Sequence, residues 1–432
     1  MNKLDTSRKY AEQLDSKDSL SKWKKEFYIP EKEILGLDGK KSVKPIQYFE
    51  GNSLGLMSTY AEEGIANEIK LWKALKGRGS DVGKKTREYR AKLVGAEFDE
   101  VIMAAGATIN IHVLISTFYQ RDGKKVKILA DELNFPSDIY ALWGQVRLKG
   151  GDPDKDLVLV KSRDGRTIDE DDIIAAMDET VSVCFLPSVY FTSGQLLDIE
   201  RLTKAAHEKG ILIGFDCCHS IGVVPHYFDK WGVDFALWCN YKYMNGGSGA
   251  IAGIYVNKNH FGTIPGMPGW WGNSWSNRFD FDTVFKPAED AQAWFVGNPS
   301  NFAQAPLYGS SKMIDEVGIE NIRAKSLKIT QYLMDLIDAE LTQAPYNYSI
   351  GNPREDKRRG GHVAIEHEEG KRVDFALRNR GILTDYRPPT TIRLTPVPLY
   401  TSYVEVWECV QHLKAVIDNK EYENYSQDQS LY

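Results

Sequence analysis

The stretch Ile211-Leu-Ile-Gly-Phe-Asp216 is a short apolar run that ends in an acid, and it decides the predicted fold. Runs of this length alternate with segments of helical period from about residue 100 to residue 260. Strands are predicted at residues 126–130, 157–160, 181–186, 211–215, 235–239 and 250–256. A helix is predicted at residues 200–209, where Gly210 stops it. Such alternation predicts an α/β protein with a mostly parallel sheet flanked by helices.

Two residues of opposite charge follow neighbouring predicted strands. Asp216 ends one strand, and Lys242 follows the next strand beside the glycine-rich turn 246–249. Ligands of α/β sheets bind at the carboxyl ends of strands, so one ligand could contact both side chains. Pyridoxal 5′-phosphate suits this pair, because a lysine forms a Schiff base with it and a carboxylate keeps its pyridine nitrogen protonated. Alternatively, Asp216 is a helix N-cap and Lys242 is a solvated surface lysine.

Two further segments could complete such a site. Ala105-Gly-Ala-Thr108 precedes a helical stretch, and its amides could bind a phosphate, although Thr108 could equally be an ordinary N-cap. Phe135-Pro-Ser-Asp138 follows another predicted strand. There the phenyl ring could stack on a pyridine and Asp138 could approach its polar edge, or the segment could be a turn with a buried Phe. Together the four segments favour pyridoxal phosphate.

After about residue 305 the pattern changes to that of a second, α+β domain. Residues 310–341 are predicted to be helical, and residues 372–380 form a predicted helix that Gly381 stops. Arg393 lies in a short extended stretch of this domain, where its planar guanidinium could grip an α-carboxylate at two points or form an ordinary salt bridge. We predict an N-terminal segment at 1–60 that packs with the small domain, a large cofactor-binding domain at 61–305, a small domain at 306–425 and a frayed tail at 426–432.

Composition excludes several classes of protein. The net charge is −6, the pI is near 5.9, and no long basic face is present, which argues against a nucleic-acid partner. No run of 18 apolar residues occurs, and residues 1–25 lack an apolar signal region. The five cysteines include the adjacent pair Cys217 and Cys218, which suits neither a disulfide framework nor a CxxC zinc site. We therefore expect a cytoplasmic protein that does not contact membranes and holds no metal.

These segments resemble the kynureninase family, within the class V, fold-type I pyridoxal-phosphate enzymes. The resemblance spans roughly residues 10 to 415, with the motifs in the family's order. The motifs are Tyr48-Phe-Glu-Gly-Asn-Ser-Leu-Gly-Leu56, Phe135-Pro-Ser-Asp138, Gly214-Phe-Asp-Cys-Cys-His219, Trp231-Gly-Val-Asp-Phe-Ala236, Tyr241-Lys-Tyr243, Gly269-Trp-Trp-Gly272 and residues 393–400.

The resemblance implies a role for each matching residue. Lys242 would form the Schiff base, Asp216 would contact the pyridine nitrogen, and Phe135 would stack on the ring. Arg393 would bind the substrate carboxylate. The other implied cofactor residues are Ala107, Thr108, Pro136, Ser137, Asp138, His219, Tyr241, Trp270 and Asn298. The other implied substrate residues are Asn298, Ser80 and Trp271. Trp270 and Asn298 would come from the neighbouring subunit of a homodimer, whose active site lies at the subunit interface.

The reaction that this resemblance implies is hydrolysis of the Cβ–Cγ bond of kynurenine, giving anthranilate and alanine, with 3-hydroxykynurenine as a possible further substrate. Lys242 would remove the Cα proton, and Tyr241 would carry a proton as water adds to the aryl ketone. Such an activity belongs to tryptophan catabolism, on the kynurenine pathway that leads to NAD biosynthesis.

Three departures from the family pattern fall in the expected active-site wall. The family usually has Gly-Lys-x-Pro-Trp with further residues, whereas here residues 83–87 run directly into a predicted helix. Ser80 stands where animal members tend to have histidine, and Pro187 replaces a small polar residue. The alternative function is therefore a kynureninase-like lyase or hydrolase for another amino acid.

A cysteine desulfurase and a non-catalytic binding module fit the sequence less well. A cysteine desulfurase needs a mobile nucleophilic cysteine, and the late candidate, Cys409, lies in an amphipathic helix pattern at residues 404–413. A binding module without catalysis would have lost Lys242 or Asp216, and both are present.

Overall fold

The computed structural model describes residues 5–77 and 80–430, which divide into two compact units. The large unit comprises residues 60–191 and 195–316, and the small unit comprises residues up to 59, residues 192–194 and residues from 317 onward. The later boundary lies between residues 316 and 317, in the last turn of the helix Asn301–Val317, whereas the sequence prediction placed it at residue 305. Within the described ranges, no helix is long and apolar enough to cross a membrane.

The large unit is built on a seven-stranded sheet in the order β4-β10-β9-β8-β7-β5-β6. The strands are β4 (Val101–Met103), β10 (Gly253–Val256), β9 (Phe235–Trp238), β8 (Leu212–Asp216), β7 (Val181–Pro187), β5 (Lys127–Asp131) and β6 (Leu157–Val160). The five strands from β9 to β6 are parallel, and β10 pairs antiparallel with both β9 and β4. The predicted α/β class with a mostly parallel sheet is confirmed.

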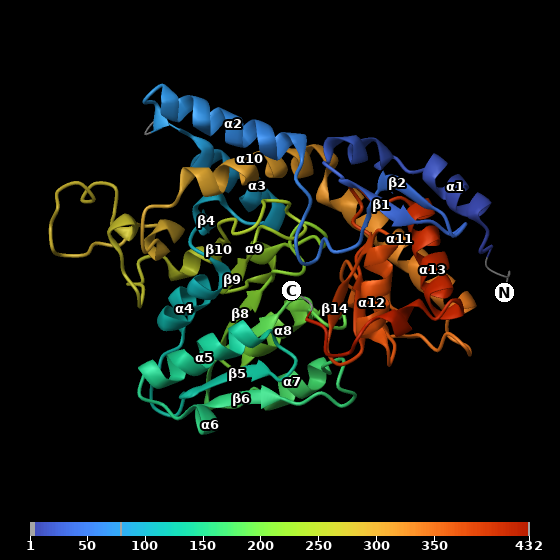
Figure 1. The fold of residues 1–432 in the computed structure, drawn as a ribbon. Helices are drawn as coiled ribbons and strands as arrows, with labels where there is room; N and C mark the ends of the chain where they lie inside the picture. The colour runs from blue at the N-terminus through green and yellow to red at the C-terminus, as the bar shows by residue number, and fades with distance from the viewer. Residues whose placement is uncertain (1–4, 78–79, 431–432) are drawn as a thin grey trace. The chain divides into compact units, whose positions relative to one another are not determined.

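Buried residues of the helices at 107–118 and 136–148 share an apolar core with the strands of this sheet. Figure 1 shows the helices of the large unit around the sheet. They are α2 (Thr59–Lys73), α3 (Val82–Val94), α4 (Ala107–Phe118), α5 (Pro136–Leu148), α6 (Pro153–Asp156), α7 (Glu170–Ala176), α8 (Ile199–Glu208), α9 (Phe228–Trp231) and α10 (Asn301–Val317). The sequence did not predict β4, because three residues are too few to show a periodic pattern. The strand predicted at residues 250–256 begins only at Gly253.

The small unit contains a four-stranded antiparallel sheet in the order β11-β12-β15-β14. Its strands are β11 (Ser349–Ile350), β12 (Val363–Glu366), β15 (Thr391–Leu394) and β14 (Asp385–Arg387). Helices α11 (Ile319–Glu340), α12 (Gly370–Asn379) and α13 (Tyr403–Asp418) contribute buried residues to the same core. The predicted helical stretch at 310–341 is two helices, because Gly318 adopts a φ of 83° between α10 and α11.

The N-terminal segment belongs to the small unit. Helix α1 (Arg8–Ser16) packs on α13, strands β1 (Glu31–Leu35) and β2 (Lys41–Pro45) form a hairpin, and β3 (Gln47–Tyr48) pairs in parallel with β13 (Ile382–Leu383). Near the other end, within the segment predicted to fray, the Gln427 side chain donates to the Glu369 carboxylate at 2.8 Å. Part of that tail therefore lies against α12.

Candidate active site

Lys242 lies just beyond β9, at the carboxyl end of the parallel strands. Its Nζ is 2.8 Å from Nε2 of His219, which follows β8 by three residues. The same Nζ lies 5.8 Å from the centre of the Tyr241 ring. The predicted meeting of the ends of these two strands is therefore present, with a half-buried lysine held beside a buried histidine.

Two carboxyl groups, those of Asp216 and Asp138, lie buried together next to this lysine. Asp216 ends β8, and its Oδ1 accepts the backbone N–H of Cys218 at 2.7 Å. Burial, and then the nearby Asp216 charge, raise the pKa of Asp138 well above its ordinary value, although Lys242 opposes the shift. The shift favours the protonated form of Asp138, so we assign the negative charge of the pair to Asp216, whose Oδ1 accepts a backbone N–H.

Two helix starts meet next to these carboxyl groups, because Asp138 lies in the first turn of the second of them. Helix α4 begins after Gly106 with no side chain capping its amides, and α5 begins with Pro136 after Phe135. The hydroxyls of Thr108 and Ser137 are 2.6 Å apart, so they join the two starts. Uncapped amides at the start of a helix of this length, with two hydroxyls beside them, suit a phosphate group.

Phe135 presents an exposed ring at the same end of the sheet. The side chain is 44% exposed, and its ring meets that of Phe191 edge to face at 5.2 Å. A ring held in this way leaves a face for stacking on a planar heterocycle. The lysine, the buried carboxylate, the hydroxyl-lined helix starts and this ring are the groups that pyridoxal phosphate requires, so the residues present fit the cofactor.

Tyr241 is the residue next to the lysine. Burial raises the pKa of its hydroxyl, so the hydroxyl stays protonated at neutral pH and can donate a proton. Two residues before it, the N–H of Cys239 donates to Sγ of Cys218 at 3.0 Å. The sequence did not predict that these two cysteines contact each other, although both follow neighbouring strands.

Asp131 is a further residue that the sequence did not single out. It ends β5, is fully buried, and accepts the N–H of Leu133 at 2.9 Å. Burial raises the pKa of its carboxyl to about 7, and its charge contributes to the raised pKa of Asp138. An acid at the carboxyl end of a predicted strand was the available signal, the same one that identified Asp216.

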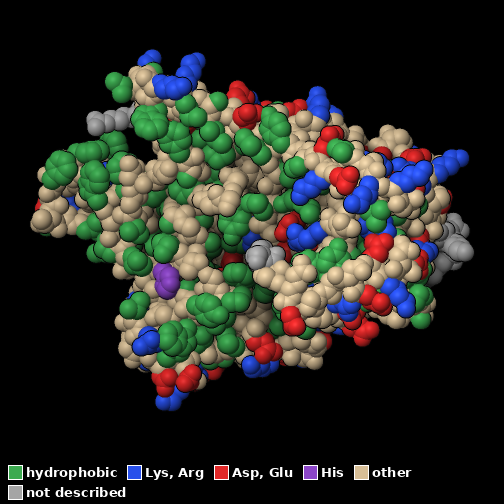
Figure 2. All heavy atoms as spheres, in the orientation of Figure 1, with side chains coloured by type: hydrophobic (Ala, Val, Ile, Leu, Met, Phe, Trp, Pro, Cys, Tyr) green, Lys and Arg blue, Asp and Glu red, His purple; other side chains and the backbone are tan. Residues whose placement is uncertain are grey.

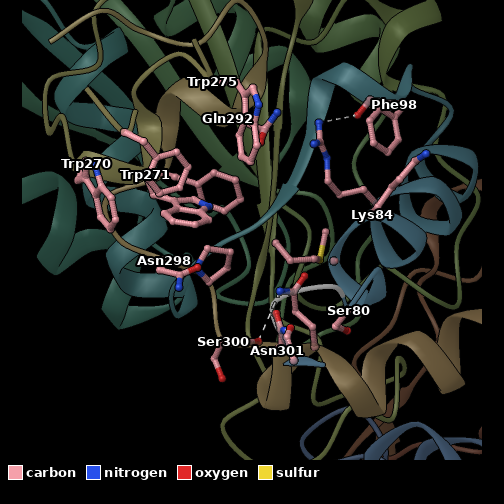
Figure 3. Close-up of a pocket in the computed structure, with 18 residues that line it drawn as sticks. Ser80, Lys84, Phe98, Trp270, Trp271, Trp275, Gln292, Asn298, Ser300 and Asn301 are labelled. Carbon is pink, nitrogen blue, oxygen red and sulfur yellow. Dashed lines mark hydrogen bonds between the residues drawn. The ribbon is translucent and has the colours of Figure 1, made fainter. Parts of the chain in front are cut away.

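Four predicted site residues, Ser80, Trp270, Trp271 and Asn298, line a separate cavity of about 1120 Å³ in the large unit (Figure 3). Ser80 contacts the carboxylate of Glu68, and the Trp270 and Trp271 rings meet at 5.5 Å. Asn298 also borders a smaller cavity together with Gly106 at the start of α4. Neither set of lining residues includes Lys242. These four side chains therefore line one cavity together, and Asn298 also reaches the start of α4.

Arg393 is the predicted site residue of the small unit. It lies on β15 and is almost fully buried. Its Nη2 donates to the Ser53 hydroxyl at 2.8 Å and forms a close ion pair with Asp385. The expected extended stretch is present, and the arginine already has an acidic neighbour that the sequence did not reveal.

Comparison with known proteins identifies the family. Residues 322–413 match the model of the kynureninase C-terminal domain. The kynureninase of Geobacillus thermodenitrificans is 48% identical over 99% of this chain and 98% of its own length. That of Bacillus mycoides is 47% identical over 96% of both chains.

Solved structures agree with the fold. An apo cysteine desulfurase from Thermococcus onnurineus has a TM-score of 0.75 at 17% identity, over 87% of this chain and 95% of its own. A mutant of C-DES with glycine covalently linked to its pyridoxal-phosphate cofactor has a TM-score of 0.74 at 15% identity, over 86% and 96%. The identity over nearly the whole chain decides the assignment: the chain belongs to the kynureninase family.

Proposed function

We propose that this chain is a pyridoxal-phosphate-dependent hydrolase that cleaves the Cβ–Cγ bond of kynurenine to give anthranilate and alanine. The observation that carries the proposal is identity of 46–48% with kynureninases over nearly the full chain. We place the reaction in the cytoplasm, in tryptophan catabolism toward NAD. The test is to add kynurenine to purified holoenzyme and to quantify fluorescent anthranilate and free alanine. Equal amounts of both products support the proposal, and no anthranilate refutes it.

The residues at the carboxyl end of the sheet would hold the cofactor and move protons. When bound, pyridoxal phosphate supplies an electron-accepting ring that acidifies the Cα proton of an amino acid. Lys242 would attach it covalently and later take up that proton at Nζ, while Asp216 keeps a negative charge beside the pyridine nitrogen. The raised pKa of Asp138 favours its protonated form, which would add no second charge. Tyr241 would donate a proton from its hydroxyl when water adds to the ketone.

The remaining cofactor residues would set position. Phe135 would stack on the ring, supported by Pro136 behind it, and the start of α4 at Ala107 with the Thr108 and Ser137 hydroxyls would bind the phosphate. His219 would hold the Nζ of Lys242 in place across 2.8 Å.

We further propose a homodimer in which a second copy supplies Trp270, Trp271, Asn298 and Ser80 to the site. These side chains line a cavity whose lining residues do not include Lys242. Trp275 of the loop at residues 262–299 also lines this cavity, and the loop carries exposed rings, since Trp275 is 72% and Phe281 76% exposed. Figure 2 shows hydrophobic side chains gathered at the edge where this loop lies. Apolar rings on this scale are typical of a surface that another chain covers.

Mixing two inactive variants tests this arrangement. If the site is shared, Lys242→Ala and Asn298→Ala homodimers are each impaired, and exchanging their subunits creates one site with both wild-type residues. Partial recovery of anthranilate formation after subunit exchange supports the shared site. Activity that stays at the level of the separate variants, in a mixture that native mass spectrometry shows to contain heterodimers, refutes it.

A second candidate is an enzyme of the same kind that acts on another amino acid. It is favoured by the altered wall, because Ser80, Gly83 and Lys84 line the cavity that also holds Trp271. Release of alanine from a different γ-keto amino acid, with none from kynurenine or 3-hydroxykynurenine, would support this candidate.

A further inference from the structure

A buried ion cluster surrounds Arg393 in the small unit. Strands β14 and β15 pair antiparallel, with Asp385 directly opposite Arg393. Ser53, more than 300 residues away in sequence, is in contact with both side chains. Arg387 completes the cluster, because its Nη2 lies 3.2 Å from the Asp385 carboxylate. One carboxylate thus holds two guanidinium groups.

The Asp385 carboxylate is charged in this cluster. Burial alone would raise its pKa, but Arg393 and Arg387 hold the pKa below its ordinary value. Two positive groups against one negative group leave a net charge of one positive unit among these three side chains. An α-carboxylate bound nearby would balance that charge.

The contacts also fix the orientation of the guanidinium. Nη2 carries two hydrogens, and the Ser53 hydroxyl and the Asp385 carboxylate accept from this one nitrogen. With both hydrogens directed, the planar group cannot turn about its last bonds without breaking an ion pair in a buried site. A long arginine side chain is otherwise free to sample many rotamers, and a misplaced clamp of this kind loses much of its affinity.

We propose that Asp385, assisted by Ser53, is a positioning residue that orients Arg393 for recognition of the substrate α-carboxylate. This inference rests on the proposed function, in which Arg393 binds that carboxylate. The opposite interpretation is that Asp385 occupies the place of the substrate carboxylate and competes with it. The two interpretations predict opposite signs for the effect of removing the Asp385 charge.

The experiment uses the holoenzyme, L-alanine as an α-carboxylate probe, and ethylamine as the same amine without the carboxylate. Their dissociation constants are measured from the change in cofactor absorbance, which needs no turnover. Wild type should bind alanine more tightly than ethylamine. Asp385→Asn should raise the dissociation constant for alanine by about 10-fold or more, because the orientation of Arg393 is lost. The dissociation constant for ethylamine should stay within about 2-fold of the wild-type value, because ethylamine has no carboxylate. Unchanged or tighter alanine binding would overturn the positioning role.

Two variants guard against a general loss of structure. Asp374→Asn removes another buried carboxylate of the small unit, which pairs with Arg378 at 2.8 Å, and it should keep the wild-type preference for alanine. Ser53→Ala leaves the ion pair intact and should weaken alanine binding by a smaller factor. If Asp385→Asn does not fold, the test rests on Ser53→Ala and on the ratio of its dissociation constants for ethylamine and alanine. A ratio equal to that of wild type overturns the inference.

Failure of the inference and failure of the proposed function give different results. Wild-type holoenzyme that binds alanine but releases no anthranilate from kynurenine refutes the proposed function. Wild-type cleavage of kynurenine, together with an undiminished alanine preference in Asp385→Asn, refutes only the role of Asp385.

Discussion

The two charged clusters of this protein are unbalanced in opposite ways. In the large unit, the Asp138 and Asp216 carboxyls lie buried beside a single lysine. In the small unit, Arg393 and Arg387 share the one carboxylate of Asp385. In the first cluster a raised pKa favours the neutral form of Asp138, whereas in the second two guanidinium groups face one carboxylate.

This difference indicates what each cluster is built to receive. Guanidinium groups stay charged at neutral pH, so the small unit's excess positive charge calls for an anion such as an α-carboxylate. Carboxyl groups can take up a proton, so the large unit can present a single charge to a protonated ring nitrogen.

The largest effect is expected from changing the two carboxyl groups one at a time. Asp216→Asn removes the charge assigned to the ring nitrogen, so anthranilate formation should fall by about 10²–10⁴-fold. Asp138→Asn replaces a carboxyl group whose raised pKa favours its neutral form, so its rate should stay within about 3-fold of wild type. Steady-state rates at saturating cofactor measure both. Equal losses in the two variants would contradict the assignment of the charge to Asp216.

Arg393→Lys tests the small unit's cluster next. Lysine keeps the positive charge but loses the two-point fork, so the KM for kynurenine should rise by about 10–100-fold, with a smaller change in kcat. Kinetics across a range of kynurenine concentrations separate the two parameters. If KM and kcat match those of wild type, the arginine has only a structural role.

Arg90 offers a contrast with Arg393, because it is buried without a carboxylate. The side chain is 0% exposed, its Nη1 contacts Sδ of Met244 at 3.2 Å, and among residues 5–77 and 80–430 no acid pairs with it. Burial lowers its pKa to about 9. Arg90→Met should therefore stabilise the protein by about 1–3 kcal/mol in urea unfolding at neutral pH. A loss of stability would show that the guanidinium has an ionic partner in solution.

The smallest effect is expected at Glu50, on the edge of the small unit's cluster. Burial, and then the charges of Asp385 and Asp374, raise the pKa of Glu50 to about 7, although Arg378 opposes them. An acid whose pKa is higher in the folded state than in the unfolded state binds more protons when folded. Its contribution to stability is therefore complete below about pH 4.5 and is lost as the pH rises through about 7. Glu50→Gln should raise the unfolding free energy by on the order of 1 kcal/mol at about pH 8.

The same variant should change little at about pH 5, where Glu50 is already largely protonated in the folded protein. Urea unfolding at the two pH values gives the comparison. A gain at the lower pH equal to that at the higher pH would contradict a raised pKa.

The sequence predicted the large unit's site better than the small unit's. Strand ends of a parallel sheet converge at one edge, so Asp216 and Lys242 could be paired from their positions in successive strands. The contact of Ser53 with Arg393 depends on pairing between distant antiparallel segments, which no local pattern encodes. The break at Gly318 was missed because both flanking helices are amphipathic and one glycine is tolerated within a helical pattern.

For the cavity of the large unit, the sequence predicted some of the lining residues but not the cavity itself. Family resemblance supplied Trp270, Trp271, Asn298 and Ser80 as site residues, but not the cavity that they line together. That cavity depends on how the loop from residue 262 to residue 299 meets α3, where Arg87 pairs with Asp290 at 3.4 Å, and no local sequence pattern encodes this contact.

The central claim is that Lys242 carries the cofactor. Holoenzyme reduced with borohydride fixes pyridoxal phosphate to whichever lysine forms the Schiff base, and peptide mass mapping then identifies that lysine. We expect the phosphopyridoxyl mass on the peptide that contains Lys242, and no such peptide from Lys242→Ala. The claim would be contradicted if a different lysine were modified. It would also be contradicted if Lys242 stayed unmodified after reduction of an enzyme preparation that had been active before it.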